Sequence, residues 1–156
     1  VVVMTNKSEA GLIRRAEKLR IPVEYLPASA FKEGKATEQL RKYEADFIVL
    51  AGFLLRIPND MLETYPNRIV NIHPSLLPKF GGKGMYGNRV HEAVLEAQEK
   101  ESGITIHYIN EHYDEGAIIL QAQCPVVEGD TPDTLANRVH QLEYEHYPKV
   151  IEQLLT

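Results

Sequence analysis

Three side chains of different chemical types stand where they could act together on a carbonyl group. Asn71 and His73 lie at i and i+2 of an apolar, strand-like segment, so both side chains leave the same face. Asp114 belongs to another segment, which sequence spacing alone does not bring within reach. An amide and an imidazole can stabilise the oxyanion of a tetrahedral intermediate, and a carboxylate can orient the imidazole and assist proton transfer. The pattern indicates acyl-group chemistry.

The rest of the chain offers no covalent nucleophile to this chemistry. There is no G-x-S-x-G motif, and the one cysteine, Cys124, falls in a late apolar strand, where a buried, inert thiol is expected. Direct transfer between two bound substrates is therefore favoured over a covalent acyl-enzyme. The six histidines form no H-x-x-x-H pair, and we expect no metal. Taken singly, each of the three residues would be an ordinary cap, turn or strand-end residue, and only the joint pattern favours catalysis.

Hydrophobic patterning predicts the elements that must position these side chains. Strands are expected at 1–4, 21–26, 46–55, 68–72, 102–110 and 116–127, and helices at 8–20, 37–45, 58–65, 88–100 and 131–155. We expect Ser8 to cap the first helix, with Leu12, Ala16 and Leu19 on one apolar face. The segment 46–55 reads as the most buried strand, ended by Gly52, and Pro58 as a first-turn proline.

Alternation of strands and helices indicates the α/β class. Because the early strands are apolar on both faces, we expect a Rossmann-like, mostly parallel sheet with helices on both faces, and a single domain over 1–156. The last two strands alternate more openly, which is typical of antiparallel or edge strands. Ligands of such sheets bind beyond the carboxyl ends of the strands, so the segments 52–57, 71–73 and 110–116 should meet.

Composition limits the classes of partner. The chain has 156 residues, 44% hydrophobic and 25% charged, and a formal net charge of −5, which argues against a general nucleic-acid binder. No apolar run reaches the ~18 residues of a membrane span. We expect a cytoplasmic protein, monomeric or homodimeric, whose partners are small molecules rather than nucleic acid or membrane.

Two segments carry a family resemblance. "VNIHPSLLPKF" at 70–80 and "SGITIHYINEHYDEGAIILQ" at 102–121 resemble the formyltransferase family that uses 10-formyltetrahydrofolate. Within it, the chain is most similar to the branch that formylates the amine of glycinamide ribonucleotide in purine biosynthesis. The resemblance implies that Asn71, His73 and Asp114 are the catalytic residues. It also implies 10-formyltetrahydrofolate as co-substrate, with no tightly bound cofactor.

The resemblance assigns further residues to the two substrates. Folate binding would fall to Leu54, Leu55, Ile57, Ile109, Asn110, Glu111, His112 and Tyr113. Ribonucleotide binding would fall to Gly52, Ile72, Pro74, His140 and Glu143. Thr105 and His107, i and i+2 on one strand, would support the catalytic residues from behind.

Two departures from the family pattern concern the substrate phosphate. The family's first strand and its glycine- and serine-rich phosphate-binding turn would precede Val1, so the sequence corresponds to the family from its second strand onward. The loop 80–87 looks longer than the common form and is glycine-rich, which suggests a lid over the ribonucleotide, with Lys83 helping to hold phosphate.

Three alternatives remain open from the sequence. A formyltetrahydrofolate hydrolase would use a similar trio with water as acceptor, but it normally carries an additional domain. A formyltransferase acting on methionyl-tRNA or a nucleotide sugar would also need additional domains. A noncatalytic folate- or nucleotide-binding fragment is the alternative from another class.

Overall fold

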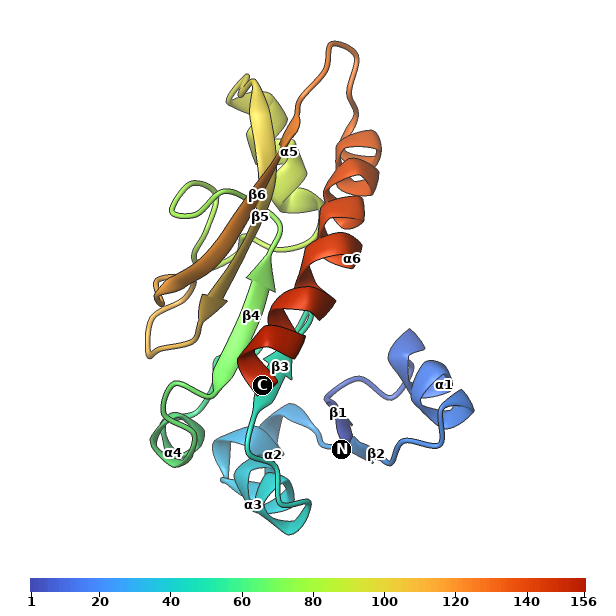
Figure 1. Ribbon diagram of the computed structural model, residues 1–156, viewed down its shortest axis with the longest axis vertical. Coiled ribbons are helices and arrows are strands. Elements are labelled where there is room, and N and C mark those ends of the chain that lie inside the picture. Colours follow the sequence, from blue (N-terminus) through green and yellow to red (C-terminus); the bar gives the residue numbers. More distant parts are fainter. The chain divides into compact units, whose positions relative to one another are not determined.

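The computed structural model describes residues 1–156, which form two sheets and six helices (Figure 1). The chain divides into two compact units that interleave in sequence, one made of 1–46 and 55–66 and the other of 47–54 and 67–156. Neither unit is one continuous segment. That these units fold as the expected single domain stays a prediction. No helix combines the length and the apolarity that a membrane crossing requires.

The first unit contains a parallel pair of short strands and four helices. β1 (Val3–Thr5) pairs with β2 (Val23–Tyr25), and the helices are α1 (Gly11–Lys18), α2 (Ala28–Lys32), α3 (Lys35–Lys42) and α4 (Asn59–Thr64). The Arg41 guanidinium on α3 donates a hydrogen bond to the Thr64 hydroxyl at 3.0 Å. The Tyr43 hydroxyl donates to the Glu24 carboxylate at 2.7 Å.

Several predictions for this unit are wrong in detail. Val1 is 97% exposed, so the segment 1–4 is not a buried strand. Ser8 does not cap α1, because residues 7–10 form a turn in which the Ala10 N–H donates to the Lys7 carbonyl, and the helix begins at Gly11. Of the three residues expected on one apolar face, only Ala16 is buried, since α1 ends at Lys18 and Leu19 is left exposed. The short helix α2 was not predicted, and Pro58 lies just before α4.

The second unit contains a four-stranded sheet in the order β3-β4-β5-β6. β3 (Ile48–Leu50) is parallel to β4 (Ile69–His73), while β5 (Glu101–Tyr108) and β6 (Ile118–Pro125) follow as antiparallel strands, β6 at the edge. The α/β class and the antiparallel character of the last two strands are thereby confirmed. The prediction that 46–55 is the most buried strand is wrong: β3 has three residues because the backbone turns at Gly52 (φ +64°), and Ser102 to His107 of β5 are all buried instead.

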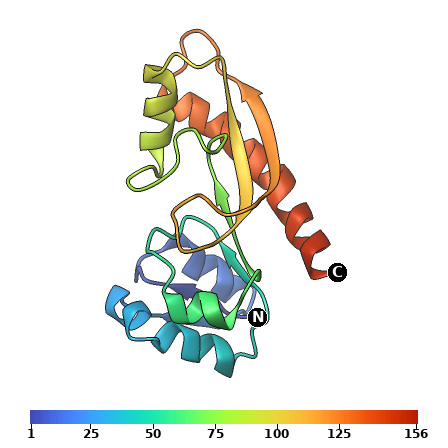
Figure 2. The same ribbon diagram turned by 90° about the vertical axis from the view of Figure 1, so that its left-hand side faces the viewer.

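One face of this sheet is apolar and covered by two helices. α5 (Asn88–Glu96) and α6 (Pro132–Leu155) pack on it, and the long helix α6 lies beside the strands in Figure 1 and crosses them obliquely in Figure 2. The core contains Val70, Ile104, Ile106 and Cys124 from the strands, with Val94, Leu135, Val139, Tyr147 and Val150 from the helices. The Tyr147 hydroxyl donates to the Leu50 carbonyl at 2.7 Å, which fastens α6 to the end of β3.

The opposite face of the same strands is polar. Side chains alternate along a strand, so Asn71 and His73 of β4 point away from the apolar core. The antiparallel register sets Asn71 opposite His107 and His73 opposite Thr105, and Thr105 opposite Gln121 of β6. This pairing places Thr105 and His107 on the same face of the sheet as Asn71 and His73, and their supporting role stays a prediction.

Candidate functional site

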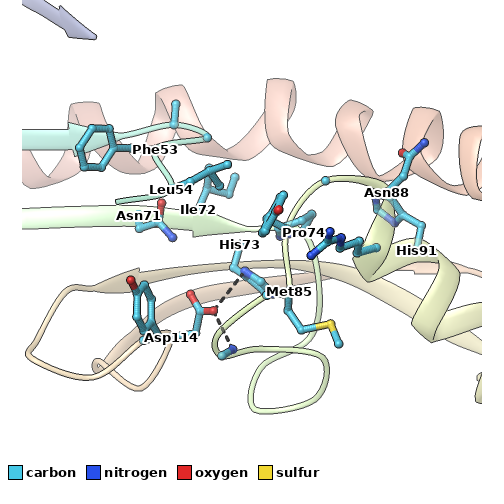
Figure 3. Close-up of a pocket in the computed structure, with 18 of the residues that line it drawn as sticks. Phe53, Leu54, Asn71, Ile72, His73, Pro74, Met85, Asn88, His91 and Asp114 are labelled. Carbon is cyan, nitrogen blue, oxygen red and sulfur yellow. Dashed lines mark hydrogen bonds and ion pairs between the residues drawn. The ribbon is translucent and has the colours of Figure 1, made fainter. Parts of the chain in front are cut away.

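A cavity of about 620 Å³ opens within the second unit, beyond the carboxyl ends of β3 and β4 (Figure 3). All three catalytic candidates line it: Asn71, His73 and Asp114. The five residues predicted for the ribonucleotide also line it, namely Gly52, Ile72, Pro74, His140 and Glu143, as do Leu54 and Tyr113 from the folate prediction. The location agrees with the rule for open α/β sheets.

His73 is buried and has an acceptor facing each ring nitrogen. Its Nε2 lies 2.8 Å from the Phe80 carbonyl oxygen, and because a carbonyl can only accept, Nε2 carries a proton. Its Nδ1 lies 3.6 Å from Asp114 Oδ2, which is beyond hydrogen-bond length. The imidazole can therefore hold protons on both nitrogens while Nδ1 remains available to a ligand.

Asp114 is positioned by backbone rather than by a salt bridge to a strong cation. Its Oδ2 accepts a hydrogen bond of 2.9 Å from the Gly82 N–H, drawn as a dashed line in Figure 3. The residue itself adopts φ +55°, a conformation that L-residues seldom take, which turns the carboxylate toward His73. Gly81 allows this approach, because a Cβ there would lie 2.5 Å from Leu77 Cδ2 and 3.3 Å from Asp114 Cβ.

Asn71 is oriented by a neutral histidine. His107 is fully buried, and this burial lowers its pKa. Its Nδ1 donates to the Tyr108 carbonyl at 3.0 Å, which leaves the lone pair of Nε2 to accept from Asn71 Nδ2 at 3.3 Å. Although Asp114 Oδ1 is 3.7 Å from the same Nε2, a neutral ring makes no ion pair there. His107 thus fixes the Asn71 amide.

Thr105 holds the loop after β4 against the sheet. Its hydroxyl donates to the Ser75 carbonyl at 2.7 Å and accepts from the Leu77 N–H at 3.0 Å. The Gln121 amide donates to the same hydroxyl at 2.9 Å and to the Leu77 carbonyl at 2.8 Å. These contacts fix the start of the segment whose Phe80 carbonyl and Gly82 N–H face His73 and Asp114. This part of the loop contacts the catalytic candidates, and its expected role as a lid stays a prediction.

The other residues of the folate prediction do not line the cavity. Leu55 and Ile57 belong to the first unit, where Ile57 is buried. The segment from Ile109 to His112 leads into the loop that carries Tyr113 and Asp114, and His112 is largely exposed. The Ile109 N–H donates to the Ile69 carbonyl, and the His112 N–H donates to Asn110 Oδ1. The assignment of these residues to folate binding therefore rests on the resemblance alone.

His91 is a cavity residue that sequence reasoning missed. It is 2% exposed, lines the cavity and leaves its buried Nδ1 without a hydrogen-bond partner. Burial lowers its pKa. No pattern in the sequence marks it, because a histidine in the first turn of a helix can be exposed or buried, and here it is buried together with Val90 and Val94.

Cys124 lies on the apolar face, away from Asn71 and His73. It is buried in the core and burial raises the pKa of its thiol, as expected for an inert cysteine. No group of three or more His, Cys, Asp or Glu side chains is arranged to hold a metal ion.

Comparison with known proteins gives consistent matches. Residues 1–151 match the family model described as Formyl transferase. The chain is 43% identical over 157 residues to "Phosphoribosylglycinamide formyltransferase, chloroplastic" of Arabidopsis thaliana, covering 97% of the chain and 54%, about half, of that relative. It is 39% identical over 160 residues to the Bacillus subtilis phosphoribosylglycinamide formyltransferase, covering 99% of the chain and 79% of that relative. The crystal structure of that enzyme from Bacillus halodurans superposes with a TM-score of 0.90 at 35% identity, covering 100% of the chain and 81% of the other.

Proposed function

Because the chain belongs to the formyl transferase family, we propose that it transfers a formyl group from 10-formyltetrahydrofolate to the primary amine of glycinamide ribonucleotide. The observation that carries the proposal is the meeting of Asn71, His73 and Asp114 on one wall of the cavity, with Asp114 3.6 Å from the His73 imidazole. The names of the relatives support this choice of substrates.

Transfer proceeds by direct attack. The amine nitrogen forms a bond to the formyl carbon, and the formyl oxygen becomes the oxyanion of a tetrahedral intermediate. The Asn71 amide and His73 Nδ1–H donate to that oxygen. Collapse breaks the bond from the formyl carbon to the folate nitrogen. The attacking amine loses one proton and the departing folate nitrogen gains one. Asp114 carries the proton between the two nitrogens. No atom is oxidised or reduced.

The surroundings of the three residues suit these roles. The Phe80 carbonyl and the Asp114 carboxylate flank the two nitrogens of His73, so a protonated ring is compensated on both sides. The neutral His107 accepts one N–H of Asn71 and leaves the rest of that amide to the cavity. Preorganised donors of this kind need no rearrangement as the oxyanion forms.

The two ends of the cavity suit two different substrates. Phe53 and Leu54 lie on the side of Asn71 and Asp114, and Leu54 and Tyr113 are both partly exposed apolar side chains in the wall. We assign this end to the pterin ring of the folate. Asn88 and His91 lie on the other side of His73 (Figure 3), with His140 and Glu143 also in the wall. We assign this end to the ribonucleotide.

A labelled transfer assay tests the proposal. The chain is incubated with 10-formyltetrahydrofolate carrying ¹⁴C in the formyl group, with and without glycinamide ribonucleotide. Label should appear in the ribonucleotide product, and little formate should form when the acceptor is absent. Formate release independent of acceptor would identify a hydrolase instead. Folate binding without either product would identify a noncatalytic binding module.

Compartment and assembly are part of the same proposal. The single cysteine and its buried, unpaired state favour a reducing compartment such as the cytoplasm. One relative is named as chloroplastic, so fractionation of the native source is the appropriate measurement. We propose that the chain is either a monomer or a homodimer, and sedimentation of the purified chain will distinguish these two states.

A further inference from the structure

We propose that Phe80 is a positioning residue for His73. Its apolar side chain packs against the core and holds its backbone at φ +56°, and this left-handed conformation directs the Phe80 carbonyl at Nε2 of His73. The inference rests on the proposed function, because it explains how Nδ1–H of the same ring is presented to the formyl oxygen.

Left-handed backbone outside glycine is confined to a few places in the chain. Six residues other than glycine have positive φ. Three of them follow a helix by two residues and belong to the hydrogen-bonded turn that ends it, namely Arg20, Glu44 and Gln98. Asn67 is of a residue type that tolerates this conformation. The last two, Phe80 and Asp114, both face His73, and Phe80 is the only apolar residue of the six.

The conformation of Phe80 is unfavourable for its residue type. A left-handed backbone crowds the Cβ atom, and a phenyl side chain has no polar group that could offset this cost by a local hydrogen bond. No helix ends before Phe80, because residues 74–79 form bends and turns after β4. Backbone of this kind persists only where the surrounding structure holds it, and it gathers at functional sites.

Contacts before, at and after Phe80 hold its backbone. The preceding Lys79 carbonyl accepts a hydrogen bond of 2.7 Å from the hydroxyl of Ser75, which is fully buried. The Phe80 side chain is partly buried and packs against the core of the second unit. Two residues later, the Gly82 N–H donates to Asp114. Of these contacts, the packing of the phenyl ring is the one that acts on Phe80 itself.

The Phe80 carbonyl determines which way the imidazole of His73 faces. Turning this ring by half a revolution about its bond to Cβ would exchange the places of nitrogen and carbon atoms. Only one orientation brings Nε2 within 2.8 Å of the carbonyl oxygen, and in this orientation Nδ1 lies 3.6 Å from Asp114. The hydrogen bond of one ring nitrogen thus fixes the task of the other. Phe80 acts on the substrate through His73.

Substitutions at Phe80 separate the side chain from the backbone conformation. Phe80→Gly keeps the left-handed conformation accessible and removes the anchor, so kcat for formyl transfer should fall about 10- to 100-fold, as displacement of a catalytic group does. The KM values of both substrates should change less than about threefold, because His73 acts mainly in the transition state. Phe80→Asn, a second variant that tolerates the conformation, should behave alike. Phe80→Tyr keeps the ring and should restore most of kcat.

Gln98→Gly is the matched control. Gln98 has φ +53°, is exposed after the end of α5 and does not line the cavity. Glycine at this position relieves the same backbone cost away from His73, and kcat should stay unchanged.

NMR of the proton on His73 Nε2 gives a readout that a merely structural role would not move. The signal is assigned by its absence in His73→Asn. Because a carbonyl holds this proton, it should exchange slowly with water. The signal should be lost in Phe80→Gly and Phe80→Asn, and it should be kept in Phe80→Tyr and Gln98→Gly.

The outcomes separate this inference from the proposed function. Unchanged kcat in Phe80→Gly and Phe80→Asn would overturn the positioning role and leave the proposed function intact. A fall in kcat with the Nε2 proton signal retained would also overturn it, because the loss would then come from general loosening of the loop. If the unaltered chain transfers no formyl group, the proposed function fails. The NMR signal then decides alone: its loss in both variants supports the orienting role of Phe80, and its retention overturns that role.

Discussion

The two faces of the β4–β6 sheet are built from the same strands and serve different ends. On one face Val70, Ile104 and Ile106 pack under α5 and α6, and removal of apolar surface from water stabilises the fold. On the other face Asn71, His73, Thr105 and His107 are buried or half-buried polar groups, each held by a specific partner. The side chains of the apolar face do not contact the reacting groups. The buried polar side chains of the other face stabilise the fold less than apolar side chains of the same burial would. Strand alternation keeps the two tasks separate, so substitutions should divide in the same way.

The largest effect is expected at Asp114. Asp114→Asn keeps the shape of the side chain and removes the charge beside His73, so kcat should fall at least about 10³-fold, roughly 4 kcal/mol of transition-state stabilisation. The melting temperature should change little, since the carboxylate makes one backbone hydrogen bond. Turnover and thermal unfolding are measured on the same preparation. Near-normal turnover would remove Asp114 from the mechanism.

The matching substitution on the apolar face is Ile104→Ala. Ile104 is fully buried, and its truncation should cost roughly 2–5 kcal/mol of unfolding free energy, measured by urea denaturation. We expect kcat of the folded fraction to stay within about threefold. Ile104→Val is the milder control, because this smaller truncation should lower the unfolding free energy by only roughly 0.5–1.5 kcal/mol. A loss of kcat as large as in Asp114→Asn, at full folding, would contradict the division between the faces.

A smaller effect is expected at Gln121, which acts on the polar face without lining the cavity. Gln121→Met keeps the length of the side chain but removes the donor to Leu77 and Thr105, so the loop that carries Phe80 and Gly82 should be held less firmly. We expect kcat to fall about threefold and the unfolding free energy by roughly 1 kcal/mol. Gln123→Met, a change at an exposed neighbour on the same strand, should lower neither kcat nor the unfolding free energy. Equal effects of the two substitutions would show that Gln121 has no positioning role.

The smallest effect concerns pH. The pKa of His107 is lowered by burial, so at pH values below the ordinary histidine pKa of about 6.5 the unfolded chain binds a proton that the folded chain does not. The unfolding free energy should therefore fall as the pH drops from about 7 toward 5, by at most roughly 1.4 kcal/mol per unit for this residue. His107→Asn should flatten the slope, and His112→Asn, at a largely exposed histidine, should not. A slope that is the same in both variants would contradict this reading of His107.

The sequence predicts much of this arrangement because alternation along a strand is a local rule. It predicts the shared face of Asn71 and His73, the supporting position of Thr105 and His107, and the long final helix, confirmed as α6. It does not bring Asp114 to His73, because that depends on a left-handed residue and on the Gly82 N–H of a distant loop. The length of β3 was overestimated, because an apolar run does not show where the backbone turns at Gly52. His91 was missed because burial of a helical histidine depends on which helix packs against it.

The most direct test is a crystal structure of the chain with glycinamide ribonucleotide and a folate analogue whose formyl group cannot leave. We predict that the formyl oxygen lies about 2.7–3.2 Å from Asn71 Nδ2 and His73 Nδ1. The acceptor amine should lie beside the formyl carbon and within reach of Asp114. A formyl group bound away from this wall would contradict the account, as would an Asp114 carboxylate turned to solvent more than ~10 Å from His73.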